Sequence, residues 1–243
     1  MRPVVVVQHE PSVPPGSITE VLARSNVPHR VVDAWQETDW PRATDASAVV
    51  VMGGTMNVDE LDAYPFLRQS RALMADAIEN GVPTLGVCLG SQMMARVLGG
   101  DVYRTEPRNA FFSPIEIDAV GDDPLIAPFA TGVEVLQFHE DTFTVPPGAR
   151  PLARSERSGL HQAFRYGDSA YAIQFHFEVD DAIVRDWCRD IGAGALATEW
   201  GTSEAELIGD ARGRFAAQQA AGRELVRSFV ALARRDPATM PAI

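Results

Sequence analysis

A cysteine stands between two glycines in residues 86–92 (GVCLGSQ), directly after a short apolar run. Residues 83–87 are typical of a short buried strand, and residues 92–98 are typical of a helix that stops at a pair of glycines. A chain that turns from a strand into a helix at Cys88 is cramped there, and only glycine neighbours relieve the crowding. The thiol would lie at a helix N-terminus, where the helix dipole and free backbone amides favour a thiolate. This pattern predicts a nucleophile.

A histidine and a glutamate follow a second apolar strand, in residues 172–178 (AIQFHFE). Their i, i+2 spacing places the side chains of His176 and Glu178 on the same side of an extended backbone. Glu178 can therefore orient His176, and His176 can act as a base toward a nearby thiol. A lone histidine in this position would more often be a half-buried residue with its hydrogen bonds satisfied.

A third segment, residues 51–56 (VMGGTM), runs from a strand into the adjacent glycines Gly53 and Gly54. Such a turn can aim a bare backbone N–H at a developing oxyanion, and the N–H of Leu89 just past the cysteine can supply a second one. Taken singly, the glycine pair is a turn and the cysteine is a structural residue. Taken together, the three segments each lie at the carboxyl end of a predicted strand, which is the edge where open α/β sheets bind ligands.

Short apolar runs alternate with helical patterns over the first part of the chain. The predicted strands there are residues 4–7, 29–33, 48–52 and 84–87, and the predicted helices are residues 18–24 and 64–80. Such strands are typical of a parallel sheet covered by helices on both faces. After residue 101 strands separated by turns indicate a mixed or antiparallel extension of the same sheet. These strands are predicted at residues 102–103, 113–119, 133–138 and 170–175.

No internal repeat or linker divides the chain. A helix is predicted over residues 181–190, and residues 203–235 are rich in Ala, Glu, Arg and Leu, as in one or two helices. We therefore expect residues 1–190 to form a catalytic α/β domain. Residues 191–243 are expected to form a helical extension that packs on the same domain.

Composition restricts the classes of function. The 243 residues are 46% hydrophobic and 22% charged, which suits a globular chain. A formal net charge of −12 disfavours nucleic acid or an anionic membrane as the main partner, because phosphates would be repelled. The sequence offers no membrane span and no leader peptide, so we expect a cytoplasmic protein in which Cys88 and Cys188 remain thiols. Compact metal-ligand spacing is missing too, so no metal and no cofactor is expected.

In these motifs the chain resembles the class I, triad glutamine amidotransferases, whose signatures are Gly-x-Cys-x-Gly-x-Gln and a late His-x-Glu. The resemblance covers residues 1–190 and is greatest to the stand-alone, GMP-synthetase-like members, which share the loop 52–58 and residues 137–143 (QFHEDTF). It implies a flavodoxin-like fold. That fold is an open, mostly parallel sheet with helices on both faces, here with an added antiparallel portion and a C-terminal helical tail.

The resemblance also implies a reaction. Cys88 would attack the side-chain carboxamide of glutamine and form a γ-glutamyl thioester, which water then hydrolyses. The amides of Gly54 and Leu89 would hold the oxyanion. His176, oriented by Glu178, would protonate the departing ammonia.

Three further residues are implied as substrate contacts. Gln92, one helical turn past the cysteine, is where the family places a positioning contact, the alternative being a residue on the helix surface. Gly53 belongs to the oxyanion loop, and His139 would be either a polar wall of the pocket or a hydrogen-bonded corner. The substrate would be a small molecule. Because this chain has no phosphate-cradling loop of its own, either a partner synthase chain accepts the ammonia or the protein works alone on a γ-glutamyl compound.

Three departures from the family pattern bear on the substrate. Thr55 stands where the oxyanion loop has proline, which would loosen the turn, and Phe177 stands where proline separates the histidine from the glutamate. Residues 109–112 (NAFF) replace a stretch with a small glycine, so Phe111 would narrow or reshape the pocket. Two alternatives follow: a γ-glutamyl peptidase with the same triad, and a non-catalytic domain that regulates a partner. The complete triad disfavours the second.

Overall fold

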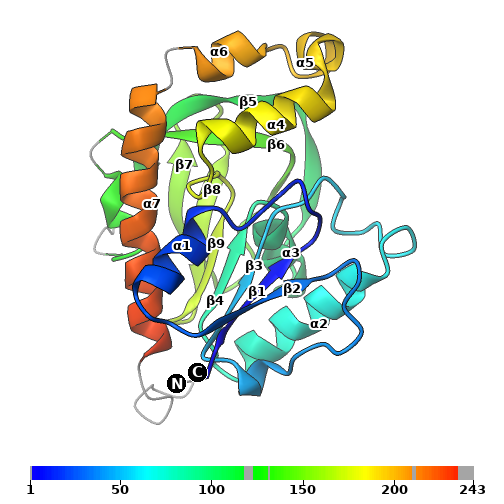
Figure 1. The fold of residues 1–243 in the computed structure, drawn as a ribbon, viewed down its shortest axis with the longest axis vertical. Coiled ribbons are helices and arrows are strands. Elements are labelled where there is room, and N and C mark those ends of the chain that lie inside the picture. The colour runs from blue at the N-terminus through cyan, green and yellow to red at the C-terminus, as the bar shows by residue number, and fades with distance from the viewer. Residues whose placement is uncertain (1, 118–122, 131, 210–211, 235–243) are drawn as a thin grey trace.

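A single mixed sheet forms the centre of the computed structural model, which describes residues 2–117, 123–130, 132–209 and 212–234. Its strands are β1 (Val4–Gln8), β2 (His29–Asp33), β3 (Ala48–Val51), β4 (Thr84–Val87), β5 (Val102–Ile117), β6 (Glu134–Phe143), β7 (Arg150–Ser155), β8 (His161–Tyr166) and β9 (Ala170–Ile173). In these residues the strand order is β2-β1-β3-β4-β9-β8-β7-β5-β6 (Figure 1). The first five in this order are parallel and the others are antiparallel, which confirms the predicted fold class.

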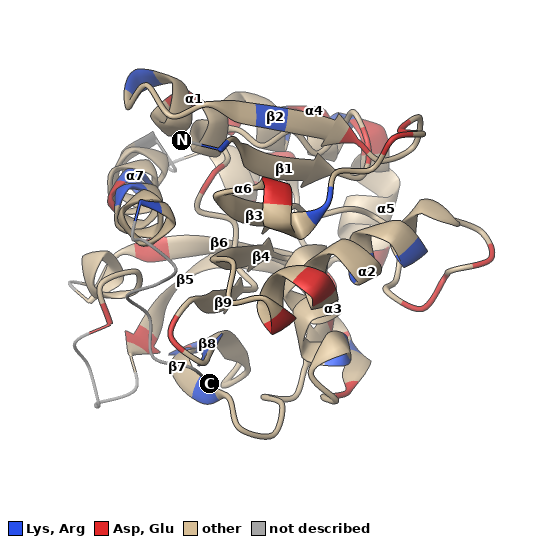
Figure 2. Ribbon diagram, turned by 90° about the horizontal axis from the view of Figure 1, so that it is seen from below, with Lys and Arg blue, Asp and Glu red and all other residues tan. Residues whose placement is uncertain are grey.

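Helices cover both faces of this sheet. They are α1 (Ser17–Arg24), α2 (Phe66–Glu79), α3 (Leu89–Val97), α4 (Asp181–Ile191), α5 (Ala193–Glu199), α6 (Glu204–Ile208) and α7 (Arg212–Ala233). Two 3-10 turns are η1 (Ala43–Asp45) and η2 (Ala127–Phe129). Figure 2 shows α1 and α7 on one side of the sheet, and α2 and α3 on the other. Within the described chain no helix is long and apolar enough to cross a membrane.

The valine run of β1 illustrates why the sheet needs two covered faces. Val4 and Val6 belong to the apolar cluster under α1 and α7, whereas Val5 and Val7 belong to the cluster under α2 and α3. Successive side chains of a strand point to opposite faces, so a strand buried on both sides has an uninterrupted apolar sequence.

The antiparallel half differs from the sequence prediction. Strand β5 is continuous, whereas the sequence predicted two separate strands, of which residues 118 and 119 lie outside the described residues. Its pairing with β6 shifts register between Arg104 and Asn109, around a polar stretch that contains a proline. The irregularity removes the alternation of apolar and polar residues there, so the middle of the strand has no local signal. Strand β7 was not predicted.

Helices α4, α5 and α6 lie beyond the carboxyl ends of the parallel strands (Figure 1). They rest on an apolar cluster that includes Phe138, Trp187, Leu196 and Leu207. The proposed boundary at residue 190 stays a prediction, and residues 235–243 of the expected extension lie outside the described residues.

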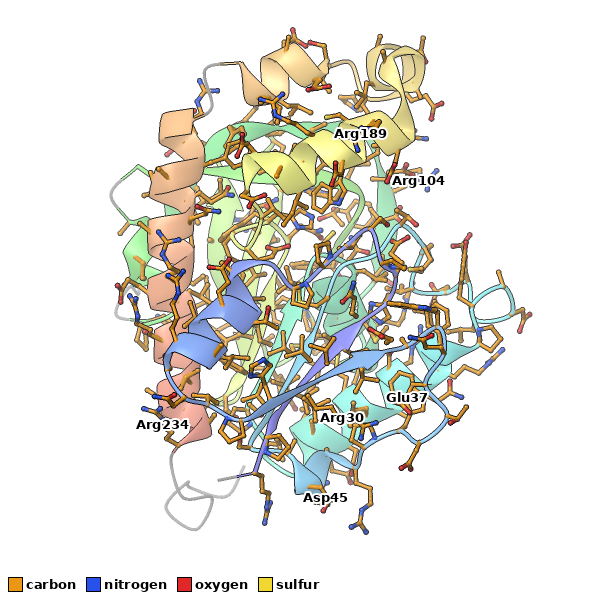
Figure 3. All side chains as sticks on the ribbon, viewed as in Figure 1. Arg30, Glu37, Asp45, Arg104, Arg189 and Arg234 are labelled. Atoms are coloured by element: carbon orange, nitrogen blue, oxygen red, sulfur yellow. The ribbon has the colours of Figure 1, made fainter. Side chains whose placement is uncertain are left out.

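Charged side chains lie at the periphery of this core. Arg30, Glu37, Asp45 and Arg234 all lie at the outside of the molecule (Figure 3). Arg30 pairs with Glu37 at 2.6 Å at the surface, and a single surface ion pair of this kind contributes little to stability. Stability therefore depends on the apolar layers.

Phe177 occupies a tight space between the end of the sheet and α7. Its side chain is fully buried and its ring packs against Phe175 at a centroid distance of 6.3 Å. The helix approaches so closely that a Cβ on Gly222 would lie 2.6 Å from the Phe177 carbonyl oxygen. The residue in place of the family's proline is therefore a packing residue.

We predict that Phe177→Ala lowers the free energy of unfolding by about 3–5 kcal/mol, because it removes a buried aromatic ring and leaves a cavity. Urea denaturation followed by circular dichroism measures this change. Tyr103→Ala, which truncates an aromatic side chain that is 45% exposed, should change stability by no more than about 0.5 kcal/mol. Equal effects of the two substitutions would contradict the prediction.

Candidate active site

Cys88 lies at the junction of β4 and α3 with a backbone φ of 51°. Among the non-glycine residues that the structure describes, only Asn26 shares a positive φ. Two close approaches require glycine on either side. A Cβ on Gly86 would lie 2.4 Å from the Gly90 carbonyl oxygen, and a Cβ on Gly90 would lie 2.0 Å from the Val51 carbonyl oxygen. The predicted strand-to-helix turn at the cysteine is confirmed, although α3 begins at once rather than at residue 92.

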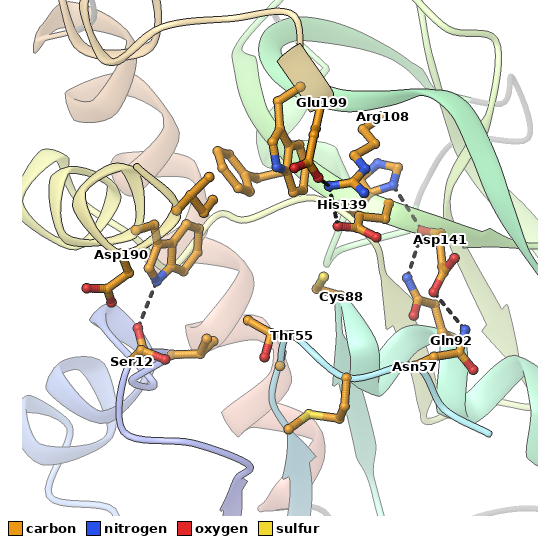
Figure 4. Close-up of a pocket in the computed structure, with 18 of the residues that line it drawn as sticks. Ser12, Thr55, Asn57, Cys88, Gln92, Arg108, His139, Asp141, Asp190 and Glu199 are labelled. Atoms are coloured by element: carbon orange, nitrogen blue, oxygen red, sulfur yellow. Dashed lines mark hydrogen bonds and ion pairs between the residues drawn. The ribbon is translucent and has the colours of Figure 1, made fainter. Parts of the chain in front are cut away.

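The two cysteines lie in different surroundings. Cys88 is 7% exposed, lies at the N-terminus of α3 and borders a cavity (Figure 4). Cys188 lies on α4 outside that cavity, and burial raises the pKa of its thiol to about 11. Both are free thiols. Only Cys88 is therefore placed for nucleophilic chemistry.

His176 is held by contacts on several sides. Its Nδ1 lies 2.7 Å from Glu178 Oε1, and the Cys88 sulfur is near enough to raise the pKa of the ring. Its backbone N–H donates to Leu136 O on β6 at 2.8 Å, and Trp187 packs edge-on against the ring. Because Nδ1 faces the carboxylate, Nε2 is left for the sulfur.

Charges decide the protonation of His176. Burial lowers the pKa of the ring, but the negative charges of Glu178 and Cys88 and their hydrogen bonds outweigh it and raise the pKa to about 10. The ring is therefore a cation at neutral pH, and it lies beside the sulfur of Cys88. The site can hold a thiolate–imidazolium pair.

The glycine pair after β3 lies beside this pair. A Cβ on Gly53 would lie 3.5 Å from Cys88 Cβ and 3.5 Å from His176 Cε1. A Cβ on Gly54 would lie 2.9 Å from the Leu89 side chain. A side chain at Gly54 would therefore crowd the first residue of α3, whereas a Cβ on Gly53 would be in ordinary contact with the cysteine and the histidine.

Thr55, which stands where the family has proline, is held by two hydrogen bonds to Glu10. Its backbone N–H donates to Glu10 Oε1 at 2.5 Å, and its hydroxyl donates to Glu10 Oε2 at 3.1 Å. Proline has no N–H and could not donate to Glu10. Threonine therefore lacks the fixed φ of proline but gains hydrogen bonds to the loop after β1.

His9 hydrogen-bonds to the backbone at the glycine pair, and the sequence analysis did not predict this role. Its Nδ1 lies 3.2 Å from the carbonyl oxygens of Met52 and Gly53, and its Nε2 lies 3.0 Å from Ser70 Oγ. Carbonyl oxygens only accept, so Nδ1 carries the proton and Nε2 accepts from the serine. Burial lowers the pKa of His9 to about 4, so the ring is neutral. A polar residue at the end of a buried strand was the available signal.

Gln92 lies in the site and not on the helix surface. It is 4% exposed, borders the cavity, and its Nε2 donates to Asp141 O at 2.8 Å. His139 lies beside it, with Nδ1 3.0 Å from the same carbonyl oxygen (Figure 4). Gln92 therefore ties α3 to β6 at the place where His139 meets the cavity.

Gln174 is a second residue that sequence reasoning missed. It is fully buried, and its Nε2 donates toward Cys88 Sγ at 3.8 Å while its Oε1 accepts from Gln92 Nε2 at 3.4 Å. It stands two residues before the histidine, on the side of the strand end that faces the cysteine. Its amide adds a hydrogen-bond donor to the sulfur.

The cavity beside Cys88 has a volume of about 390 Å³. Its floor comes from the predicted motifs, and its outer wall comes from α4, α5 and the start of β5. The wall residues include Arg104, Arg108, Trp187, Ile191, Ala195, Glu199 and Trp200. The expected helical extension thus contributes to the same cavity as the cysteine.

Phe111 does not narrow this cavity, contrary to the expectation from residues 109–112. It lines a separate hollow, where the guanidinium of Arg157 lies 4.0 Å from its ring centroid. The neighbouring residue Arg108 lines the cavity, whereas residues 109–112 do not. Its Nη1 lies 2.8 Å from Glu140 Oε1 and 2.8 Å from Glu199 Oε2, which joins β5 and β6 to α5.

The structure brings the predicted site residues together. Cys88, His176, Gly54, Gln92 and His139 all border one cavity. The other three predicted residues contact these five. Glu178 hydrogen-bonds to His176, Gly53 lies beside Cys88, and Leu89 lies beside Gly54. In the described chain no group of three or more His, Cys, Asp or Glu side chains is arranged to hold a metal ion.

Residues 16–182 match the model of the family described as Glutamine amidotransferase class-I. The chain is 32% identical over 146 residues to the glutamine-hydrolyzing GMP synthase of Thermomicrobium roseum, which is 59% of this chain and 26% of that protein. It is 32% identical over 135 residues to one subunit of the glutamine-hydrolyzing GMP synthase of Sulfolobus acidocaldarius, which is 54% of this chain and 67% of that subunit. The match to the T. roseum protein thus spans about a quarter of its length.

Two crystal structures are similar over nearly the whole chain. A glutamine amidotransferase from Thermotoga maritima has a TM-score of 0.84 at 27% identity and covers 95% of this chain and 99% of its own. A glutamine amido transferase from Methylobacillus flagellatus has a TM-score of 0.86 at 26% identity and covers 97% of each chain. The similarity thus extends past the family motifs into α5, α6 and α7.

We predict that His176 is an imidazolium at pH 8, whereas His9 and His139 are neutral rings. Histidine-labelled NMR spectra recorded between pH 5 and 10 report these states directly. Glu178→Gln should lower the pKa of His176, because it removes the carboxylate charge that stabilises the cation. Glu20→Gln, a matched change on the exposed face of α1, should leave the three rings unchanged. A wild-type His176 that titrates near its ordinary pKa of 6.5 would contradict the proposed pair.

Proposed function

Because the chain belongs to the class-I glutamine amidotransferase family, we propose that it hydrolyses the carboxamide of glutamine or of a γ-glutamyl amide through a thioester on Cys88. The observation that carries this proposal is the position of His176, buried between Glu178 and the Cys88 sulfur at the edge of a cavity. That arrangement gives one nucleophile and one proton donor to a single carbonyl group.

The first half of the reaction forms the thioester. The Cys88 thiolate attacks the carboxamide carbon, an S–C bond forms, and the π electrons of the carbonyl move to its oxygen. The backbone amides of Gly54 and Leu89 hold this oxyanion. His176 then gives its Nε2 proton to the amide nitrogen, the C–N bond breaks with its electron pair on nitrogen, and ammonia leaves as the carbonyl re-forms.

The second half releases glutamate. The now neutral His176 takes a proton from water, whose oxygen attacks the thioester carbon. The S–C bond of this second tetrahedral intermediate breaks and returns the thiolate, so one water is consumed for each ammonia released. Glu178 keeps the imidazole in the tautomer with a proton on Nδ1 throughout.

The remaining predicted residues shape the site around these steps. Gly53 lies next to Cys88 and His176, with its Cα facing both, and belongs to the loop that supplies the Gly54 amide. Gln92 borders the cavity and positions the substrate there. Its amide is held by a hydrogen bond to the Asp141 carbonyl oxygen, which also holds His139. We further propose that a separate synthase chain uses the ammonia, as the name of the matched S. acidocaldarius protein, a subunit of a GMP synthase, suggests for that protein.

A second candidate is the hydrolysis of a larger γ-glutamyl amide or peptide. The cavity favours it, since the space beside Cys88 continues to Trp187 and Trp200 on the outer wall. The same triad would serve both reactions. Mass-spectrometric product detection on a panel of glutamine, γ-glutamyl peptides and γ-glutamyl amines separates them, and turnover of none of these would support a non-catalytic domain.

We predict that Cys88→Ala lowers glutamate release by at least about 10⁴-fold, because the covalent intermediate can no longer form. A coupled glutamate assay measures this loss. Cys188→Ala, the matched removal of the other buried thiol, should keep activity within about threefold. Retention of activity by Cys88→Ala would refute the nucleophile assignment.

A diazo-ketone analogue of glutamine should alkylate Cys88 and leave Cys188 unmodified. Cys88 borders the cavity beside the His176 ring, whereas Cys188 lies outside it and burial raises the pKa of its thiol. Peptide mapping by mass spectrometry identifies the labelled residue. Preferential labelling of Cys188 is the result that would count against the site.

A further inference from the structure

One side of the Cys88 cavity is a continuous row of aromatic rings that starts at His176. Trp187 packs edge-on against His176 with ring centroids 4.9 Å apart, and it contacts Phe138 at a centroid distance of 5.6 Å. Phe138 in turn contacts Trp200 at 4.6 Å. All four rings border the cavity. Trp187, Phe138 and Trp200 together are called the aromatic wall.

The aromatic wall is held by polar contacts at both of its ends. The indole Nε1 of Trp187 donates to Ser12 O at 2.8 Å, which uses the only hydrogen-bond donor of that side chain. At the other end, the guanidinium of Arg108 lies 5.3 Å from the ring centroid of Trp200 and pairs with Glu199 at 2.8 Å. Because the rings are already in position, little conformational entropy is lost when a ligand binds to them.

The polar side of the cavity lies across Cys88 from this wall. Figure 4 shows Ser12, the acceptor of the indole hydrogen bond, and Asp190 of α4 on one side of Cys88. Gln92 and Asp141 lie on the other side. A substrate bound at the cysteine therefore has polar groups available for its charged glutamyl part and aromatic rings at its opposite end.

The reaction directs the leaving nitrogen toward the aromatic wall. His176 has to give its proton to that nitrogen, so the nitrogen lies beside His176 as it departs. A substituent on the nitrogen is one bond further on, where Trp187 packs against His176 and borders the cavity. Glutamine carries only hydrogen on this nitrogen and leaves the wall in contact with water. An apolar substituent would cover the wall, which is favourable in free energy.

We propose that the aromatic wall binds an aromatic ring carried by the leaving nitrogen, so that the preferred substrates are γ-glutamyl amides of amines that bear such a ring. This inference rests on the proposed amide hydrolysis and selects among its substrates. The cavity of about 390 Å³ lies within the range of about 300–1,000 Å³ that is typical of pockets for drug-sized ligands.

The chemistry of the two half-reactions is unchanged. Cys88 forms the S–C bond, the C–N bond breaks with its electron pair on nitrogen, and the proton of His176 goes to that nitrogen. The aromatic amine then leaves in the place of ammonia. Water hydrolyses the thioester to glutamate, so one water is consumed for each amine released.

The test compares kcat/KM for the γ-benzylamide, the γ-methylamide and the γ-(4-aminobutyl)amide of L-glutamate, with amine release followed by mass spectrometry. Wild-type protein should prefer the benzylamide to the methylamide by about 10- to 100-fold, as for the burial of one aromatic ring. Trp200→Ala, at the far end of the aromatic wall, should lower this ratio about 10-fold, because part of the contact surface is lost. Trp200→Phe, which keeps a ring, should retain most of the ratio.

Trp35→Ala is the matched control, since it removes a tryptophan that is 37% exposed and lies outside the cavity, and the ratio should stay unchanged. A wild-type ratio of one or less, equal losses on both amides in Trp200→Ala, or a preference for the cationic aminobutyl amide over the benzylamide would overturn this inference. Hydrolysis of glutamine would then leave the proposed function intact.

Failure of the wild-type protein to hydrolyse glutamine and all three amides would overturn the proposed function and this inference with it. Circular dichroism checks that each variant keeps its fold. The wild-type ratio tests the inference independently of the folding of any variant.

Discussion

The position of the nucleophile depends on a backbone contact that leaves no room for a side chain. A Cβ on Gly90 would lie 2.0 Å from the Val51 carbonyl oxygen, so the first turn of α3 is pressed against the end of β3. The chain can enter that turn only through a positive φ at Cys88. Because β3, β4 and β9 are parallel neighbours, their carboxyl ends then bring the glycine pair, the cysteine and the histidine to one edge of the sheet.

The buried histidines of this edge differ in charge for one physical reason. Burial alone disfavours an imidazolium, and it keeps His9 and His139 neutral against carbonyl oxygens and a hydroxyl. His176 has the same burial but faces a carboxylate and a sulfur that can be anionic, and the pKa is raised. The partner thus decides the role of each ring. A cation can deliver a proton, whereas a neutral ring with a fixed tautomer can support a loop or accept a hydrogen bond.

The outer wall of the cavity comes from a different part of the chain from the cysteine and the histidine. The motifs supply the floor of the cavity, and the outer wall comes from α4, α5 and β5. Arg108 joins these parts through its two carboxylate partners, and its guanidinium also lies 5.3 Å from the ring centroid of Trp200. Trp187 connects this wall to the catalytic residues, because its ring packs edge-on against His176 at a centroid distance of 4.9 Å.

Local patterns in the chain were enough to predict the parallel strands, the strained turn at Cys88 and the pairing of His176 with Glu178. Each follows from a short-range rule: apolar periodicity, the freedom of glycine, and the two-residue repeat of an extended chain. The same patterns did not reveal the contact of His9 with the turn at Gly53, which joins residues 43 apart, or the contact of Gln174 with the cysteine, which joins residues 86 apart. They also misplaced Phe111, because a bulged strand hides which side chains face which cavity. Only the folded chain shows these contacts. The partner of a buried polar group is selected by how distant segments pack together, and a local sequence pattern does not contain that information.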